Sequence, residues 1–120
     1  MRVSQNSLNP SLKNQIIKTF AQTISDFKNI SQIKTFLDDF FTPAEIETYA
    51  KRLAIAYWLK KGRSYENIKG NLKVSSATIA EVKQTMDRPG FEQAIKAIEA
   101  EEWASVWTQK IQKFARLDRK

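Results

Sequence analysis

An all-α fold is predicted for this chain by three observations. Only three glycines and three prolines occur among 120 residues, which leaves little of the turn chemistry that the hairpins of a β-sheet protein need. Apolar residues recur at the spacing of a single helix face along most of the chain. Between these stretches stand residue types that begin or end helices. The length is that of one small domain, so we expect a single domain over residues 1–120.

Residues 11–41 are expected to form two amphipathic helices. After a polar stretch that ends at Pro10, apolar residues follow at helical spacing: Leu12, Ile16, Ile17, Phe20, Ile24 and Phe27. Asn29 and Ser31 interrupt this pattern, and Ser31 is suited to cap a second helix. The second helix carries a strongly aromatic face: Ile33, Phe36, Leu37, Phe40 and Phe41. Both apolar faces need a partner surface, because isolated helices of this length are marginal in water.

Residues 42–61 are expected to form the central helix. Thr42 is placed as the N-cap, Pro43 at the first helical position, and Glu45 within reach of a capping box with Thr42. The second half of this helix is apolar around most of its circumference, which is typical of a helix contacted from several sides. Gly62, preceded by two lysines, supplies the C-terminal stop.

The pattern of residues 63–87 predicts two short helices joined by a tight turn, the shape that inserts a helix into a DNA groove. Apolar residues stand where two such helices pack across each other: Ile68, Leu72, Val74, Ile79 and Val82. Ser75 is a natural N-cap, so the second helix is expected to begin there and to present Ser76, Ala77 and Thr78 outward. Helix-turn-helix units also serve only for packing in some proteins, so the motif alone leaves both roles open.

A long C-terminal helix is expected over residues 90–116, after a break at Arg88-Pro89-Gly90. Its apolar stripe consists of Ile95, Ile98, Trp103, Trp107, Ile111 and Phe114. The interval from Ile98 to Trp103 exceeds one turn, which indicates a bend or two separate partners. Trp103 and Trp107 share one face and could close the core, pack on a second subunit or line a small-molecule pocket. The chain ends in basic residues that are either solvated or contact phosphates: Arg116, Arg119 and Lys120.

Charge and residue content narrow the function further. A formal net charge of +7 and a pI near 9.7 indicate a polyanionic partner such as double-stranded DNA. The absence of cysteine and histidine excludes disulfides, the common zinc sites and thiol or imidazole catalysis. The acidic pairs Asp38/Asp39 and Glu101/Glu102 point about 100° apart on a helix, so neither forms a shared acid–base site. We therefore expect no catalytic residues, no metal site, no cofactor and no enzymatic activity.

No apolar stretch has the length of a signal peptide's core or of a membrane span. We therefore expect a cytoplasmic protein without membrane contact.

One stretch resembles the core of the Trp repressor superfamily: FFTPAEIETYAKRLAIAYWLKKGRSYENIKGNLKVSSATI. The shared features are an apolar-Thr-Pro-x-Glu helix start, an arginine about ten residues later, a glycine stop, and a helix-turn-helix that ends in Ala-Thr-Ile. The resemblance covers roughly Phe40 to Met86. It implies a multi-helix all-α fold in which two subunits interlock through their N-terminal helices, here residues 11–41, as an intertwined homodimer. Such a dimer places two DNA-binding heads one DNA turn apart.

The resemblance also implies the position of an effector pocket. In the tryptophan-sensing members an indole lies between two arginines, and the residues before the proline help to line the pocket. Phe41, Thr42 and Arg52 match part of this description, whereas the second arginine is Glu81 here and a serine near the ligand amine is matched only by Thr85. The Glu81 carboxylate removes one cationic face and repels the carboxylate of a free amino acid. We therefore predict a remnant of the pocket that does not sense tryptophan, and any other effector is unknown.

The resemblance also implies a DNA-binding surface, which matches the family more completely than the effector pocket does. Lys69 matches a backbone contact of the first helix, and Ala77 and Thr78 match the start of the recognition helix. Glu66 and Asp87 replace basic phosphate contacts, which predicts modest affinity and an altered sequence preference. The predicted DNA-binding residues are Lys69, Lys73, Ser75, Ser76, Ala77, Thr78, Ala80 and Lys83.

The predicted function is therefore a dimeric, sequence-preferring DNA-binding transcriptional regulator, a Trp repressor-like protein that does not respond to tryptophan. Two alternatives stay open. One is a helical protein-interaction module in which the helix-turn-helix is only a scaffold. The other is a DNA-binding accessory of a replication or mobile-element system, because replication initiators and transposases use related folds.

Overall fold

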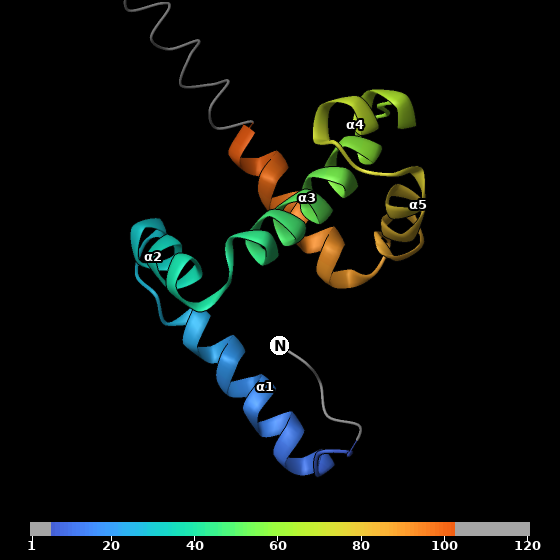
Figure 1. Cartoon of the computed structure of the whole chain (residues 1–120). Helices are drawn as coiled ribbons and strands as arrows, with labels where there is room; N and C mark the ends of the chain where they lie inside the picture. The colour runs from blue at the N-terminus through green and yellow to red at the C-terminus, as the bar shows by residue number, and fades with distance from the viewer. Residues whose placement is uncertain (1–5, 103–120) are drawn as a thin grey trace, which may run out of the picture. The chain divides into compact units, whose positions relative to one another are not determined.

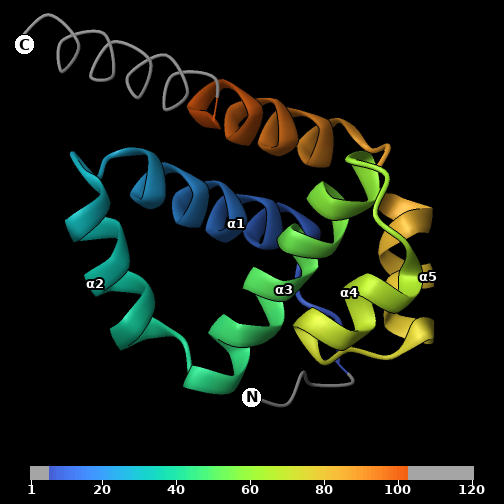
Figure 2. The same cartoon turned by 90° about the horizontal axis from the view of Figure 1, so that it is seen from above.

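The computed structural model describes residues 6–102, and in this range the chain forms helices and no strand (Figures 1 and 2). The helices are α1 (Pro10–Ser25), α2 (Ile30–Phe40), α3 (Pro43–Lys60), α4 (Tyr65–Leu72) and α5 (Ser76–Thr85), followed by a helix over residues 89–102. The predicted all-α fold is thereby confirmed. None of the helices in the described range combines the length and the hydropathy needed to cross a membrane.

The chain divides into two compact units, Met1–Ile46 and Glu47–Lys120, with the boundary inside α3. We call them the N-terminal unit and the C-terminal unit. The single domain over residues 1–120 stays a prediction.

Asparagine residues start both helices of the N-terminal unit. The Asn9 side chain accepts hydrogen bonds from two backbone N–H groups of the first turn of α1, at 2.9 and 3.2 Å, and Pro10 takes the first helical position. Asn29 caps α2 by accepting from the Gln32 N–H at 2.9 Å, and its backbone is extended. The prediction that Ser31 caps this helix was wrong, because Ser31 lies inside the first turn.

Aromatic rings join α1 to α2. The Phe20 ring of α1 lies edge-on to the rings of Phe36 and Phe40 of α2, at centroid distances of 6.2 and 5.4 Å. Despite these contacts, neither helix contains a buried residue. Several aliphatic side chains of α1 remain between 38% and 57% exposed: Leu12, Ile16, Ile17 and Ile24. Within the N-terminal unit, α2 therefore covers the apolar face of α1 only in part.

Helix α3 begins with the predicted capping box. The Thr42 hydroxyl oxygen accepts from the Glu45 N–H at 3.1 Å, and the Glu45 carboxylate accepts from the Thr42 N–H at 2.9 Å. The backbone and side-chain hydrogen bonds from Thr42 lower the pKa of the Glu45 carboxyl below its usual value. The helix ends at Lys60, and Gly62 supplies the predicted stop with φ +84°, a conformation that glycine adopts without strain.

The hydrophobic core lies in the C-terminal unit and draws on α3, α4, α5 and helix 89–102. Its buried members are Ile55, Ala56, Ile68, Ile79, Val82 and Ile95. Three of these residues were predicted to hold the helix-turn-helix together, and the predicted Leu72 and Val74 are half-buried against the same core. The helix-turn-helix is thus anchored to α3 by shared apolar burial.

Helix 89–102 follows a break at residues 86–88 and begins at Pro89. It continues through residues 99–102 without interruption, so the change of phase predicted there is not a break in the helix. The predicted stripe from Trp103 onward, together with the basic chain end, lies outside the described residues.

The end of α3 is tied to helix 89–102 by a small polar cluster. The Lys61 ammonium lies 3.7 Å from the Glu102 carboxylate and 5.4 Å from the centroid of the Tyr57 ring. The Tyr57 hydroxyl oxygen is buried without a hydrogen bond of normal geometry among the described residues. Its interaction with the Glu102 carboxylate, followed by burial, raises the Tyr57 pKa to about 12, so the hydroxyl is neutral at physiological pH.

Candidate functional site

Helix α4 is held at both ends by local hydrogen bonds. The Ser64 hydroxyl caps its start by accepting from the Asn67 N–H at 3.1 Å, and Ile68 turns inward to the core. The helix ends at Lys73, which has φ 57° and ψ 52° and donates its N–H to the Lys69 carbonyl at 2.9 Å. This left-handed residue reverses the chain within a tight turn and costs about 1–2 kcal/mol for a residue with a side chain.

Helix α5 begins where the sequence predicts. The Ser75 hydroxyl oxygen accepts from the Thr78 N–H at 3.1 Å, and the two hydroxyl oxygens lie 2.9 Å apart in a second hydrogen bond. Ser76 and Ala77 are exposed in the first turn, whereas Thr78 is half-buried. The start of α5 is therefore fixed by its cap, and it presents small residues to solvent.

The outer face of α5 consists of four exposed residues at helical spacing: Ala77, Ala80, Glu81 and Gln84. Ile79 and Val82 are buried on the opposite side. Gln84 is absent from the predicted DNA-binding residues, although it lies four residues after Ala80 and seven after Ala77. That spacing is the signal that could have identified it.

The structure brings the predicted DNA-binding residues together on α4, the turn and α5. All of them are exposed except the half-buried Thr78. The Lys83 ammonium lies 5.8 Å from the ring centroid of Tyr65 on α4, and this contact links the two helices beside their shared core.

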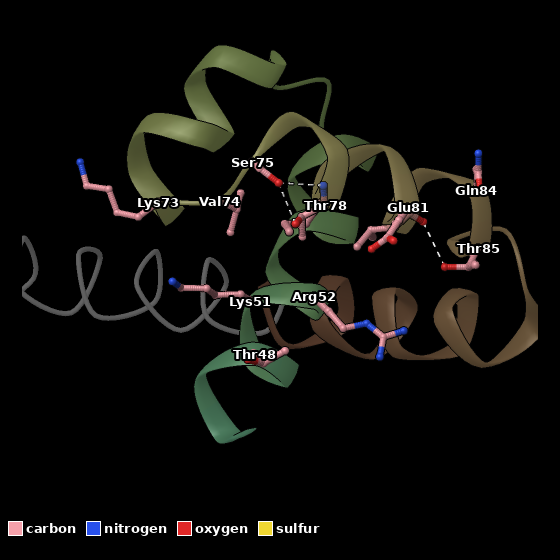
Figure 3. Close-up of a pocket in the computed structure, with 12 residues that line it drawn as sticks. Thr48, Lys51, Arg52, Lys73, Val74, Ser75, Thr78, Glu81, Gln84 and Thr85 are labelled. Atoms are coloured by element: carbon pink, nitrogen blue, oxygen red, sulfur yellow. Dashed lines mark hydrogen bonds between the residues drawn. The ribbon is translucent and has the colours of Figure 1, made fainter. Parts of the chain in front are cut away.

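A cavity of about 730 Å³ lies between α3 and α5 beside the turn (Figure 3). Arg52, Glu81 and Thr85, which were predicted as an effector-pocket remnant, line it. Phe41 and Thr42 do not. Phe41 packs against the Phe40 ring at 5.2 Å, and Thr42 caps α3.

Four charged side chains line this pocket. Lys51, Arg52 and Lys73 supply three cations, and Glu81 supplies the carboxylate. The half-buried Lys51 forms an ion pair with the exposed Glu47 at 3.8 Å, whereas the other three form no ion pair with any described residue. The sequence-based prediction missed Lys51, because its place in the pocket depends on how α3 packs against α5.

Comparisons with known proteins agree with this architecture. The profile of the Trp repressor protein family matches residues 15–99. The protein YerC of Bacillus subtilis (strain 168) is 28% identical over 96 residues, which are 78% of this chain and 92% of YerC. A TrpR-like protein from Eubacterium eligens ATCC 27750 has a crystal structure that is similar with a TM-score of 0.69 and 26% identity, covering 76% of this chain and 96% of that chain. The matched range includes every helix from α2 to α5 and most of helix 89–102, and on this basis the chain belongs to the Trp repressor family.

Proposed function

We propose that this chain is a DNA-binding transcriptional regulator that acts as a homodimer and recognises a preferred sequence. The exposed outer face of α5, positioned by the α4–turn–α5 unit, is the observation that carries the proposal. An exposed helix face of this kind enters the major groove in helix-turn-helix proteins. The net charge of +7 supports binding to a polyanion.

Each part of the helix-turn-helix has a chemical role in this proposal. Ala77 and Ala80 are small enough to let the helix approach base edges and thymine methyl groups. The Gln84 amide matches the donor and acceptor of adenine, and the Glu81 carboxylate accepts from the amino group of cytosine. Lys69, on the exposed side of α4, contacts the phosphate backbone without reading sequence.

The homodimer is proposed because the N-terminal unit leaves so much apolar surface accessible. The exposed apolar side chains of its helices are Leu12, Ile16, Ile17 and Ile24 of α1 and Ile30 and Phe40 of α2. Extensive exposed apolar surface marks an interaction site in a protein. A second copy offers the same surface, which suits a two-fold interface.

Tryptophan is not the proposed effector. In the pocket the Glu81 carboxylate of α5 lies across from Arg52 of α3, at the position of the second arginine of the tryptophan-sensing members, and an amino acid's carboxylate beside Glu81 would be repelled (Figure 3). Calorimetric titration should therefore show no micromolar binding of tryptophan, and a micromolar dissociation constant would refute this part of the proposal.

Binding to duplex DNA of random sequence tests the core of the proposal. The logarithm of the association constant should fall linearly with the logarithm of the salt concentration, because bound lysines and arginines displace counterions from phosphates. Undetectable binding at low salt would contradict a DNA-binding function.

A protein-interaction module is the second candidate, favoured by three exposed carboxylates on the helix-turn-helix and the residues that follow it. Glu66, Glu81 and Asp87 are all exposed and would repel phosphates. Absence of DNA binding in the experiment above, together with a stable fold, would favour this candidate over the regulator.

A further inference from the structure

The pocket between α3 and α5 gathers positive charge from two separate elements. Lys51 lies on α3, outside the helix-turn-helix, and Lys73 lies in the turn. In Figure 3 the side chains of Lys51 and Lys73 both extend toward the left of the view, Lys73 farther outward than Lys51, whereas Arg52 and Glu81 lie toward the right. The pocket therefore has a cationic side that the carboxylate does not occupy.

Carboxylates of the protein compensate the positive charges of these two ammonium groups only weakly. Lys73 forms no ion pair among the described residues. The Lys51 ammonium is 3.8 Å from the carboxylate of Glu47, and the two side chains are 29% and 70% exposed, respectively. An ion pair this long, with one largely exposed partner, contributes little free energy, so Lys51 is available to a stronger anionic partner.

A hydroxyl donor lies in the same pocket. Ser75 and Thr78 share one hydrogen bond between their hydroxyl oxygens, at 2.9 Å, and either can be the donor. Whichever hydroxyl accepts this bond keeps its own hydrogen free to donate. Two ammonium groups and one hydroxyl are donors for an anion with several acceptor oxygens, as a phosphate is.

We propose that Lys51, Lys73 and the Ser75–Thr78 hydroxyl pair form a binding site for a phosphate group. The inference rests on the proposed function, because a DNA backbone phosphate is the source that a bound duplex would supply. It adds a contact from α3 to a surface otherwise made by the helix-turn-helix. A free phosphorylated small molecule would present the same chemistry, and the two sources are separated by experiment.

Salt-dependent binding to random duplex DNA tests the DNA source. Lys51→Gln should lower the slope of log association constant against log salt concentration by about 0.9 per subunit, the value for one phosphate contact on B-form DNA. Lys51→Arg should keep the wild-type slope. Lys96→Gln, which removes an exposed charge from helix 89–102, is the matched control and should also keep it.

Titration of the full chain with inorganic phosphate, without DNA, tests the free source. Backbone amide resonances of Ser75 and Thr78 should shift with phosphate but not with chloride at equal ionic strength, and Lys51→Gln should abolish the shift. A change in salt slope assigns the site to the DNA backbone, and a phosphate-dependent shift alone assigns it to a small molecule. If neither occurs, the phosphate site is refuted.

The two proposals fail in different ways. If the wild-type chain does not bind DNA, the proposed function is refuted. The phosphate titration then still tests whether the pocket binds phosphate. Suppose instead that the wild-type chain binds DNA, that Lys51→Gln keeps the wild-type salt slope, and that phosphate does not shift the amide resonances. In that case only the phosphate site is refuted.

Discussion

Lys73 holds a left-handed backbone conformation at the turn of the helix-turn-helix, with φ 57° and ψ 52°. A side chain in this region clashes with the neighbouring carbonyl, whereas glycine adopts it freely. The lysine therefore costs stability at a position where the proposed phosphate site uses its charge.

Lys73→Gly should stabilise the protein by about 0.5–1 kcal/mol, because it removes the left-handed strain. Lys69→Gly is the matched control, since it removes the same charge from inside α4. It should destabilise the protein by about 0.8–1 kcal/mol. Urea denaturation measures both changes, and equal destabilisation by the two variants would contradict the assignment of strain to Lys73.

Glu81 is the carboxylate on the outer face of α5, and it also lines the pocket. Glu81→Gln should strengthen binding to random duplex DNA, because it removes repulsion between this carboxylate and phosphates. Exposed charge interactions are worth about 0.2–1 kcal/mol, which corresponds to a roughly 1.4- to 5-fold gain in affinity. Glu101→Gln removes an exposed carboxylate from helix 89–102 and should leave the affinity unchanged. Weaker binding of Glu81→Gln would show that the carboxylate aids DNA binding.

At the scale of the helices, the sequence predicted the boundaries that depend on one local signal. Thr42 with Glu45, Gly62, and Ser75 each mark the helix end that the structure shows. The start of α2 was missed because Asn29 and Ser31 are both capping residue types two positions apart. Only the extended backbone of Asn29 decides between them.

The capping box of α3 should make stability depend on pH. The hydrogen bonds from Thr42 lower the pKa of Glu45 in the folded state, so the carboxylate stabilises the fold fully above its ordinary pKa of about 4.3. This contribution is lost as the pH falls from there through the lowered pKa. Glu45→Gln keeps a side chain that can cap the helix but cannot titrate, so its stability should fall less steeply in acid.

Denaturant midpoints measured between neutral pH and about pH 3 test this expectation, a range that spans the ordinary glutamate pKa. Thr42→Ala removes the hydroxyl partner and should cost about 1 kcal/mol at neutral pH. It should also make the loss of stability toward low pH less steep. If the stabilities of wild type and Glu45→Gln fell equally steeply with decreasing pH, the role given to this carboxylate would be contradicted.

The candidate site was only partly predictable because it combines local and tertiary signals. Ser75 and Ala77 follow from the cap and helix start, and Gln84 follows from helical spacing. Lys51 could not be assigned from the sequence, because it reaches the pocket only through the packing of α3 against α5.

The proposed recognition of a two-part DNA site depends on dimer formation. Ile16 is 50% exposed on the uncovered face of α1. Ile16→Asp should shift the protein toward monomer, because a buried unpaired carboxylate in an apolar interface is strongly unfavourable. Asn14→Asp introduces the same charge at an exposed polar position of α1 and should leave the dimer intact. Light scattering over a concentration series measures both masses, and a wild-type monomer at all concentrations would contradict the interlocked architecture.

Selection of bound sequences from a pool of random duplexes is the decisive test of a dimeric, sequence-specific regulator, because it reports binding, symmetry and specificity together. A dimer with two exposed α5 helices predicts an enriched palindrome whose half-sites lie about one helical turn, roughly 10 base pairs, apart. Binding without any enriched sequence, or enrichment of a single half-site without symmetry, would contradict a dimeric sequence-specific regulator.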